Sequence, residues 1–542
     1  MNEASRTRAD WLLLAGFCAF LFFFGLNYFG LIGADEPRYA QVAREMLARH
    51  DWITPTLDGK PWLEKPVLYY WQAMLVYRVF GVSDWAARLP SALDATLMIL
   101  TLYWFLLRFR RGAHLDGALA AASCAAVIGY ARAASPDMPL TAALTLSLLA
   151  WYAWHETGAK VYLAVSYLFV ALGTLAKGPV APLLVVAIVV IFASAQRQYE
   201  LIRRSLWLPG LLIFCLTALP WYVLVQLRNP EFFRVFILQH NLARFGTNLY
   251  HHPQPVWFYL PVILLALVPW TVFVMVAAYD TACAWWSGRS SSPQSQDDLS
   301  VFLLIWLLLP VLFFSLSQSK LPGYIVPSVP AGALLFAGYL HRRMSGQQSV
   351  SRLPLLFHSV VAAAPLVPAF MIQYILVQHR FPWGRGAAVA IAIALAVATG
   401  IALTLLRTSG LLLLRFVTLV PVVLTVAAIL RIGGPTLDAT LSARPLAKEL
   451  SGIDTKNLPL ALLGVSRETD YGLNFYRGQT SAHYDEGQIP PGEHLLVAPE
   501  GAALQIAKFT PDRRVSHLGN FAAQHLDYYW VSAPGMMAGM HH

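Results

Sequence analysis

Charged residues are scarce in this chain. Only 13% of its 542 residues are Asp, Glu, Lys or Arg, whereas 57% are hydrophobic and the mean hydropathy is +0.54. A soluble protein contains about 25% charged residues. The composition excludes a soluble enzyme, a disordered protein and a fibrous protein, and it is typical of a protein that crosses a membrane many times.

Cysteine is rare as well. The four cysteines lie far apart, in or beside apolar segments, so we expect small core residues rather than disulfides or metal ligands. The net charge of +10 comes from the part before residue 432, and the remainder is slightly acidic. Positive charge in the hydrophobic part of a membrane protein usually sets its topology, so a nucleic acid is not an expected partner.

Apolar segments long enough to span a bilayer recur along the first 431 residues. The first has no small-residue cleavage site after it, and we predict a retained anchor. About thirteen spanning helices are predicted, at about 20 residues each. They lie at 11–32, 89–107, 115–131, 137–155, 160–176, 179–195, 206–226, 257–280, 300–317, 322–340, 354–377, 386–406 and 411–431.

Basic residues of the short loops gather mostly on one side of these spans. By the positive-inside rule, the N-terminus is expected in the cytoplasm of a bacterial cell. An odd number of spans then places the C-terminus outside, together with the long segments 33–88 and 227–256. The sequence therefore predicts an inner-membrane protein whose outer segments lie in the periplasm.

The tail differs in character from the rest. Short apolar runs at 460–465, 494–498 and 528–531 are typical of strands, separated by turn residues and helical stretches. We expect an all-α membrane domain over residues 1–431 and a small periplasmic α/β domain over 432–542. The tail either packs against the membrane domain or contacts a substrate head group.

The outer segment 33–88 holds an acidic pair, Asp35 and Glu36, directly after the first apolar anchor. Arg38 follows at once, and this position favours a functional role for Asp35 over a solvated loop charge. Two amphipathic juxtamembrane helices with aromatic faces are predicted in this segment, at the membrane interface. They would hold the polar residues just above the bilayer.

Several basic residues occur on the outer side, against the topological bias. In the short outer loops they are Arg132, Lys177, Lys320, Arg380 and Arg385, of which three lie beside Pro or Gly, and the long outer segments add Lys65 and Arg244. Any one of them could simply extend to lipid head groups. As a set, they indicate a site for a lipid phosphate at the outer membrane face.

Two adjacent histidines, His251 and His252, lie in the outer segment 227–256. In a turn they could share a zinc ion, with Glu64 as a third ligand. Two histidines alone are a weak signal, since a zinc site needs at least three protein ligands. A divalent metal is therefore optional.

Four motifs carry a resemblance to a known family. They are Gly33-Ala34-Asp35-Glu36-Pro37-Arg38-Tyr39, Trp62-Leu63-Glu64-Lys65-Pro66-Val67-Leu68-Tyr69-Tyr70-Trp71, Ala134-Ser135-Pro136-Asp137 and Ser319-Lys320-Leu321-Pro322-Gly323-Tyr324. The chain resembles the integral-membrane glycosyltransferases that use polyprenyl-phosphate sugars, of GT-C type. Within them it is most similar to the lipid A aminoarabinose transferases, which are related to protein O-mannosyltransferases.

This resemblance implies an inverting transfer of 4-amino-4-deoxy-L-arabinose from undecaprenyl phosphate to a lipid A phosphate at the periplasmic face, which confers resistance to polymyxin. No cofactor is required, and a monomer is expected. The implied catalytic residues are Asp35, Arg38 and Asp137. The implied ligands of the donor phosphate are Lys65, Arg244, Lys320 and Tyr324.

The charge balance of such a reaction indicates what cations would do. The departing polyprenyl phosphate changes from a diester with about one negative charge to a monoester with nearly two. Cations on the leaving oxygen therefore stabilise the transition state more than the ground state. Asp35 would act as a base for a hydroxyl acceptor, whereas for a phosphate acceptor it would position a cation or the sugar amine.

Two rival functions remain open. A protein O-glycosyltransferase that uses polyprenyl-phosphate mannose would need a hydroxyl acceptor. A lipid-linked sugar transporter would carry ionisable residues near the bilayer midplane, but the charges of this chain cluster at one face.

Overall fold

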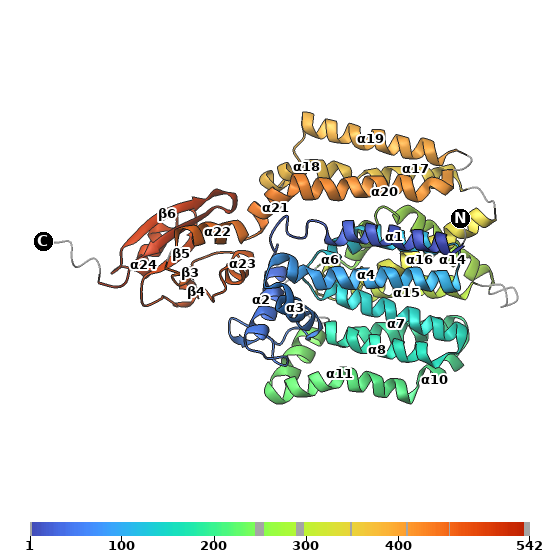
Figure 1. Cartoon of the computed structure of the whole chain (residues 1–542), viewed down its shortest axis with the longest axis horizontal. Helices are drawn as coiled ribbons and strands as arrows, with labels where there is room; N and C mark the ends of the chain where they lie inside the picture. Colours follow the sequence, from blue (N-terminus) through green and yellow to red (C-terminus); the bar gives the residue numbers. More distant parts are fainter. Residues whose placement is uncertain are drawn as a thin grey trace.

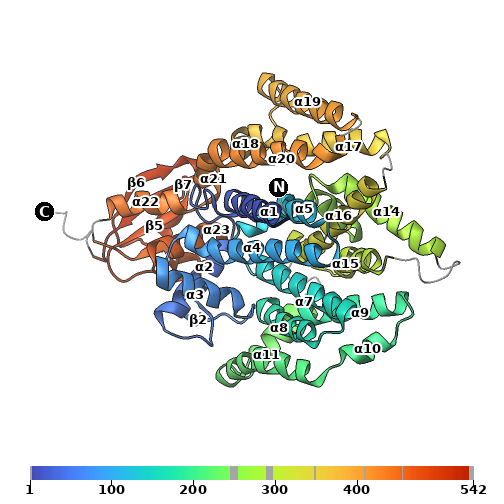
Figure 2. The same cartoon turned by 45° about the vertical axis from the view of Figure 1, so that its right-hand side comes forward.

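The computed structural model describes residues 3–243, 254–288, 297–346, 350–407, 410–454 and 456–535. A bundle of helices forms most of the molecule, and a small domain with a sheet lies at one end of it (Figure 1; Figure 2). The first half of the bundle contains α1 (Glu3–Cys18), η1 (Ala19–Phe23), α4 (Asp84–Phe109), α5 (His114–Ser123), α6 (Ala125–Ala131), α7 (Asp137–Thr157), α8 (Lys160–Lys177), α9 (Val180–Ala195), α10 (Glu200–Ser205), α11 (Leu208–Arg228) and η2 (Phe233–Ala243).

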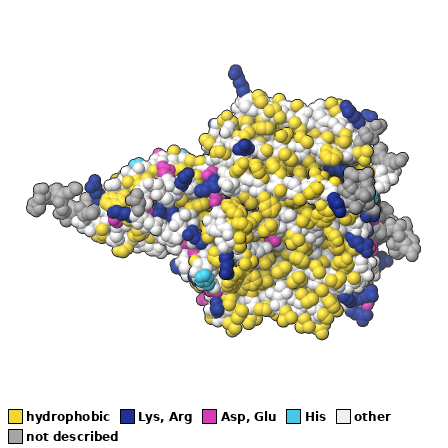
Figure 3. Space-filling view, viewed as in Figure 1, with side chains coloured by type: hydrophobic (Ala, Val, Ile, Leu, Met, Phe, Trp, Pro, Cys, Tyr) yellow, Lys and Arg dark blue, Asp and Glu magenta, His cyan; other side chains and the backbone are white. Residues whose placement is uncertain are grey.

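The second half continues the same architecture. It contains η3 (Val256–Phe258), α13 (Tyr259–Ala266), α14 (Thr271–Gly288), α15 (Asp298–Ser315), η5 (Pro322–Ser328), α16 (Val329–Ser345), α17 (Arg352–Ala363), α18 (Leu366–Gln378), α19 (Arg385–Leu405), α20 (Gly410–Ala428), η6 (Ile429–Gly433) and α21 (Gly434–Leu441). On the face shown in Figure 3, hydrophobic side chains cover most of the bundle. The expected all-α membrane architecture is confirmed, and the chain is a multi-pass membrane protein.

The span count depends on how bent helices are treated. Within the described ranges, eight helices are long and apolar enough to cross a membrane, or ten if each of two bent pairs forms one span. These pairs are α5 with α6 and η3–α13 with α14. About thirteen spans are predicted, and each of these segments contains helix, although the first, 11–32, is helical only as far as Phe23. The helices α1, α7 and α9 do not meet the length and hydropathy criterion for a membrane span.

The outer segment 33–88 forms the two predicted juxtamembrane helices, α2 (Asp35–Ala48) and α3 (Leu68–Phe80). Asp35 and Glu36 occupy the first turn of α2, where negative charge suits the positive end of the helix dipole. A short antiparallel hairpin, β1 (Thr56–Leu57) with β2 (Lys60–Pro61), connects the two helices.

The C-terminal domain is α/β, as expected. Its five-stranded sheet has the order β4-β3-β5-β7-β6; β3 pairs parallel with β4 and β5, and β7 pairs antiparallel with β5 and β6. The predicted strands correspond to β3 (Leu460–Leu462), β5 (His494–Pro499) and β7 (Leu526–Val531), while β4 (Ala482–His483) and β6 (Val515–Phe521) were not predicted. The remaining elements are α22 (Arg444–Ile453), α23 (Arg467–Arg477), η7 (Tyr484–Glu486), α24 (Ala503–Phe509) and η8 (Ala522–Gln524).

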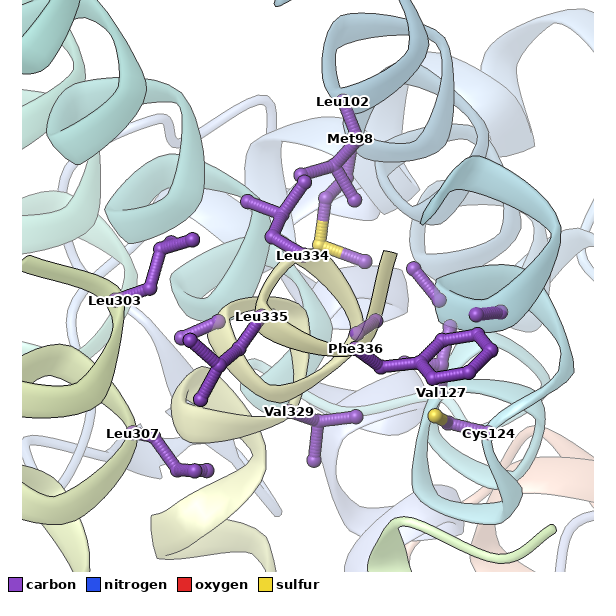
Figure 4. Packing of buried hydrophobic residues seen from close by; sticks show 14 of the residues in the cluster. Met98, Leu102, Cys124, Val127, Leu303, Leu307, Val329, Leu334, Leu335 and Phe336 are labelled. Carbon is purple, nitrogen blue, oxygen red and sulfur yellow. The ribbon is translucent and has the colours of Figure 1, made fainter. Parts of the chain in front are cut away.

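The core of the bundle is built around α16. Leu334, Leu335 and Phe336 of this helix are fully buried and contact side chains of α4, α15 and the α5–α6 region (Figure 4). Cys124 is one of these buried neighbours, and all four cysteines are free. Close packing at this centre fixes the ends of the helices on which the site is built.

A buried ion pair joins three segments at the end of the bundle beside the C-terminal domain. The guanidinium of Arg88, near the start of α4, donates to both carboxylate oxygens of Glu36 at 3.0 and 2.6 Å. The same guanidinium donates to the backbone carbonyls of Leu26, Phe29 and Gly30 at 2.7–2.9 Å. The Glu36 carboxylate also accepts from the backbone N–H groups of Ile32 and Ala134. The pair therefore fixes the loop before Asp35 to the loop before Asp137.

The C-terminal domain contacts the outer segment through several polar bonds. Arg444 forms an ion pair with Asp84 at 2.7 Å. The Tyr476 hydroxyl accepts from the backbone N–H of Leu31 at 2.7 Å, and Arg44 of α2 donates to the Phe475 carbonyl. Helix α23 thus lies directly on α2, beside the acidic pair.

We expect Arg88→Met to destabilise the protein by about 3–5 kcal/mol, because it leaves the Glu36 charge buried without its cation. The double variant Glu36→Gln/Arg88→Met should recover part of that loss. Arg203→Ala, which breaks an exposed pair with Glu200, is the control and should leave Tm unchanged. Thermal unfolding of the purified protein in detergent measures these effects, and an unchanged Tm for Arg88→Met would contradict the structural role of the pair.

Candidate active site

Asp35 and Arg38 form an ion pair on the first turn of α2. The Asp35 side chain is 60% exposed, whereas that of Arg38 is only 15% exposed. The Arg38 guanidinium lies 5.1 Å from the ring centres of Tyr39 and Trp62 and 5.9 Å from that of Tyr471. An arginine held by aromatic faces in this way is fixed in position and remains a cation.

The electrostatic environment keeps Arg38 charged. Burial works against its charge, but Tyr39 and the carboxylates of Asp35 and Glu64 outweigh this effect, so the pKa of Arg38 is raised. The pKa of Tyr39 is also raised, first by burial and then by the negative charge of Asp35. The negative charge of Asp137 also raises the pKa of Tyr39, so the carboxylates of Asp35 and Asp137 both lie near the Tyr39 phenol.

A second ion pair lies beside the first. Asp137 begins α7, Lys177 ends α8, and the two side chains are paired. The Lys177 ammonium also lies 4.9 Å from the centre of the Tyr324 ring. Gly323 makes this arrangement possible, because a Cβ at that position would lie 2.7 Å from Asp137 Oδ1.

Lys177 and Tyr324 border a cavity of about 600 Å³, which we call the lysine cavity. Its polar lining residues are Glu64, Lys65, Lys177, His240, Asn241, Ser317 and Tyr324. Its apolar lining residues are Leu140, Pro179, Val180, Leu183, Phe236, Phe313 and Phe314. A cavity with cations and apolar helix surfaces in one wall suits an anionic lipid.

The structure places some predicted site residues together and others apart. Lys65, Tyr324 and Glu64 line the lysine cavity, and Asp137 is paired with one of its lysines. Lys320 is not among the lining residues. Its ammonium donates to the backbone carbonyls of Gln254 and Ser317 at 3.0 and 2.5 Å.

The predicted residues Arg244, His251 and His252 lie outside the described residues. Glu64, the third residue of the possible zinc site, lies 3.8 Å from His240 Nε2. In the described part of the chain, no group of three or more His, Cys, Asp or Glu residues could hold a metal ion.

Sequence reasoning placed Lys177 among the outer cations but did not assign it to the donor phosphate. Its position at the end of a span, against the topological bias, was the available signal. The sequence does not predict Tyr471 as a site residue, because nothing in its local sequence indicates that α23 reaches Arg38.

The fold of this chain matches that of known membrane proteins. The chain superimposes on the crystal structure of ArnT from Cupriavidus metallidurans bound to undecaprenyl phosphate with a TM-score of 0.77, over 96% of this chain and 97% of that one, at 23% identity. The apo structure of the same protein gives 0.74. A family profile described as dolichyl-phosphate-mannose-protein mannosyltransferase matches residues 64–223. The fold is therefore that of the integral-membrane glycosyltransferases.

Within that class, the chain is a homologue of proteins named undecaprenyl phosphate-α-4-amino-4-deoxy-L-arabinose arabinosyl transferase. It is 33% identical to one from Pseudomonas fluorescens over 370 residues, which cover 67% of this chain. It is 32% identical to one from Aeromonas hydrophila over 328 residues, or 59% of this chain. The matched segments span 61% and 58% of those relatives' own length. The resemblance carried by the motifs is confirmed, and it supports an inner-membrane protein.

We expect Gly323→Ala to destabilise the protein by about 1–3 kcal/mol, because the new methyl group would displace Asp137 or the Tyr130 hydroxyl. Gly338→Ala on α16 is the matched control. A Cβ there meets only the end of Arg342 at 3.6 Å, so this change should be neutral or slightly stabilising. Thermal unfolding compares the two variants. If Gly323→Ala were as stable as Gly338→Ala, the close approach of Gly323 to Asp137 would be refuted.

Proposed function

We propose that this protein transfers 4-amino-4-deoxy-L-arabinose from undecaprenyl phosphate to a phosphate of lipid A. The observation that carries the proposal is the lysine cavity, in which Lys65 and Lys177 lie beside two carboxylates and an apolar wall. An undecaprenyl phosphate has the matching parts, an anionic head and an apolar chain. The relatives named above support the identity of the sugar.

The transfer is a single displacement. An oxygen of the acceptor phosphate bonds to the anomeric carbon while the bond from that carbon to the donor phosphate oxygen breaks, and the electron pair leaves with undecaprenyl phosphate. Negative charge therefore grows on the donor phosphate, and Lys65 and Lys177 stabilise it there. Arg244 and Lys320 remain proposed ligands of the same phosphate.

Asp35 has a positioning role in this reaction. A lipid A phosphate is already ionised and needs no general base, so the carboxylate is available to hold Arg38 in place. Arg38 in turn faces the site between aromatic rings. Because Asp35 is largely exposed, its outer oxygen can also meet the ammonium group of the sugar.

The proposed topology follows from the charges of the loops. Residues 1–431 form the transferase domain, with its N-terminus in the cytoplasm. Residues 432–542 form a periplasmic domain, and the active site lies at the periplasmic face.

We propose a monomer that needs no cofactor, since the displacement balances without one. A zinc ion bound by Glu64, His251 and His252 would be an optional addition to the site. The added ammonium lowers the negative charge of lipid A and thereby weakens the binding of polymyxin.

Lys65→Ala should lower the rate of sugar transfer by on the order of 100-fold or more, because it removes a cation from the leaving phosphate. The assay uses the full-length protein in proteoliposomes, with undecaprenyl-phosphate aminoarabinose and lipid A. Lys60→Ala, on the exposed hairpin of the same outer segment, is the control and should retain the wild-type rate. Equal rates for Lys65→Ala and wild type would contradict the assignment. Transfer to a peptide hydroxyl instead of lipid A would favour the O-glycosyltransferase alternative.

Asp35→Asn should lower kcat by on the order of 10- to 100-fold with no loss of Tm, because it weakens a charge-assisted hydrogen bond to Arg38. The side chain is exposed, so stability should not change. Asp512→Asn, on the surface of the C-terminal domain, is the control for removing an acidic charge. Full activity of Asp35→Asn would exclude both the positioning role and a role as base.

A further inference from the structure

The C-terminal domain reaches the candidate site through one helix, α23. This helix lies beside α2, where the C-terminal domain meets the bundle (Figure 1). Two neighbouring residues of α23 are bonded to the outer segment 33–88: the Asn474 side chain donates to the Asp58 carboxylate at 3.2 Å, and the Phe475 carbonyl accepts from Arg44. These bonds fix α23 on α2 and on the hairpin that follows it.

Helix α23 is buried on two of its faces. Leu473 belongs to the hydrophobic core of the C-terminal domain, together with Leu446. Phe475 is also buried, but it belongs to the hydrophobic cluster of the outer segment, in which Val42 and Met46 of α2 are completely buried. The helix is thus shared between two cores, and close packing sets its position relative to α2.

Tyr471 lies on the face that α23 presents to α2. It precedes Phe475 by four residues, so the two side chains are neighbours on one side of the helix, and both pack in the cluster of the outer segment. The start of the helix is fixed as well, because the Ser466 hydroxyl accepts from the Thr469 N–H at 3.3 Å. The half-buried Tyr471 side chain is therefore held in place by the fold of the helix that carries it.

Arg38, the site residue that Tyr471 contacts, has few hydrogen bonds of its own. In the described part of the chain only its Nη2 donates, to Asp35 and to the Tyr39 hydroxyl at 3.4 Å, and its buried Nε has no acceptor there. The guanidinium is instead surrounded by the rings of Tyr39, Trp62 and Tyr471. Of these three rings, that of Tyr471 is the one supplied by the C-terminal domain.

The Tyr471 ring offers the guanidinium an uncharged face. Burial raises the pKa of Tyr471, so its phenol is neutral at neutral pH. The attraction to Arg38 therefore comes from the π electrons of the ring. Because a phenylalanine ring has the same face, the hydroxyl of Tyr471 is not needed for this contact.

We propose that Tyr471 is a positioning residue for the transfer reaction: its ring holds the Arg38 guanidinium beside Asp35, so the site is complete only when α23 is docked on α2. This inference rests on the proposed function, because Arg38 acts in that reaction. The Arg38 side chain is only 15% exposed, and loss of the Tyr471 ring would open one side of it to water. A cation that is free to move stabilises a transition state less than one held in place.

The test removes the ring and keeps an apolar side chain. Tyr471→Leu and Tyr471→Met do this in two ways, so that a failure of one variant to fold does not end the test, and Tyr471→Phe keeps the ring. Phe509→Leu is the matched control, because Phe509 is another partly exposed aromatic residue of the C-terminal domain, on α24. The full-length proteins are compared by kcat and donor KM in proteoliposomes and by Tm in detergent. The rate at which phenylglyoxal, an arginine reagent, modifies Arg38 is followed by mass spectrometry.

We expect Tyr471→Leu and Tyr471→Met to lower kcat roughly 3- to 30-fold, the range that corresponds to one cation–π contact, with donor KM and Tm unchanged. Modification of Arg38 should become several-fold faster in both variants, because one wall around the guanidinium is lost. The exposed Arg203 is the internal reference and should react at the same rate in all proteins. Tyr471→Phe and Phe509→Leu should match the wild type in every measurement.

A wild-type kcat in both Tyr471→Leu and Tyr471→Met would overturn the proposal. So would a lower kcat without faster modification of Arg38, because the ring would then act on another group. Loss of activity in Tyr471→Phe would assign the effect to the hydroxyl, and a large fall in Tm of both ring-free variants would make Tyr471 a structural residue; either result also overturns it. A wild-type protein that transfers no aminoarabinose to lipid A would contradict the proposed reaction instead, whereas the modification of Arg38 needs no turnover and still shows whether Tyr471 holds it.

Discussion

The Glu36–Arg88 ion pair is the interaction on which the end of the bundle beside the C-terminal domain depends. It is almost completely buried, and it holds the carbonyls at the end of the first helical segment, the start of α2 and the loop before α7 at one point. A buried charge pair is expensive unless its hydrogen bonds are complete, and here the surrounding backbone supplies them. Asp35 and Asp137 follow directly from the two loops that the pair joins, so their separation is fixed by it.

The lysine cavity, on the side of α7, α8 and η5, gathers cations and aromatic rings. A second cavity, of about 470 Å³, lies on the side of α6, α18 and α20 and is lined mostly by apolar residues. The C-terminal domain contributes to the candidate site, because the ring centre of Tyr471 on α23 lies 5.9 Å from the Arg38 guanidinium. The site is therefore assembled from the membrane bundle, the juxtamembrane helices and the tail together.

Much of this could be predicted from the sequence, because membrane topology and local motifs are short-range signals. Apolar length revealed the helices, and the position of Asp35, Lys65 and Tyr324 in motifs placed them near one another. The role of Glu36 could not be predicted, since its partner Arg88 is 52 residues away, near the start of the apolar helix α4. The contact of Tyr471 with Arg38 could not be predicted either, because it depends on how the C-terminal domain packs against α2. Lys320 lay in the right loop, but only the structure shows that backbone carbonyls hold its ammonium.

We propose that the carboxylates and cations of the candidate site take part in transferring an amino sugar to lipid A. Mass spectrometry of lipid A from cells with and without this protein tests it most directly. We expect the protein to add the mass of one amino-pentose to a lipid A phosphate. Identical lipid A from the two kinds of cell, grown with the donor lipid present in both, would contradict it.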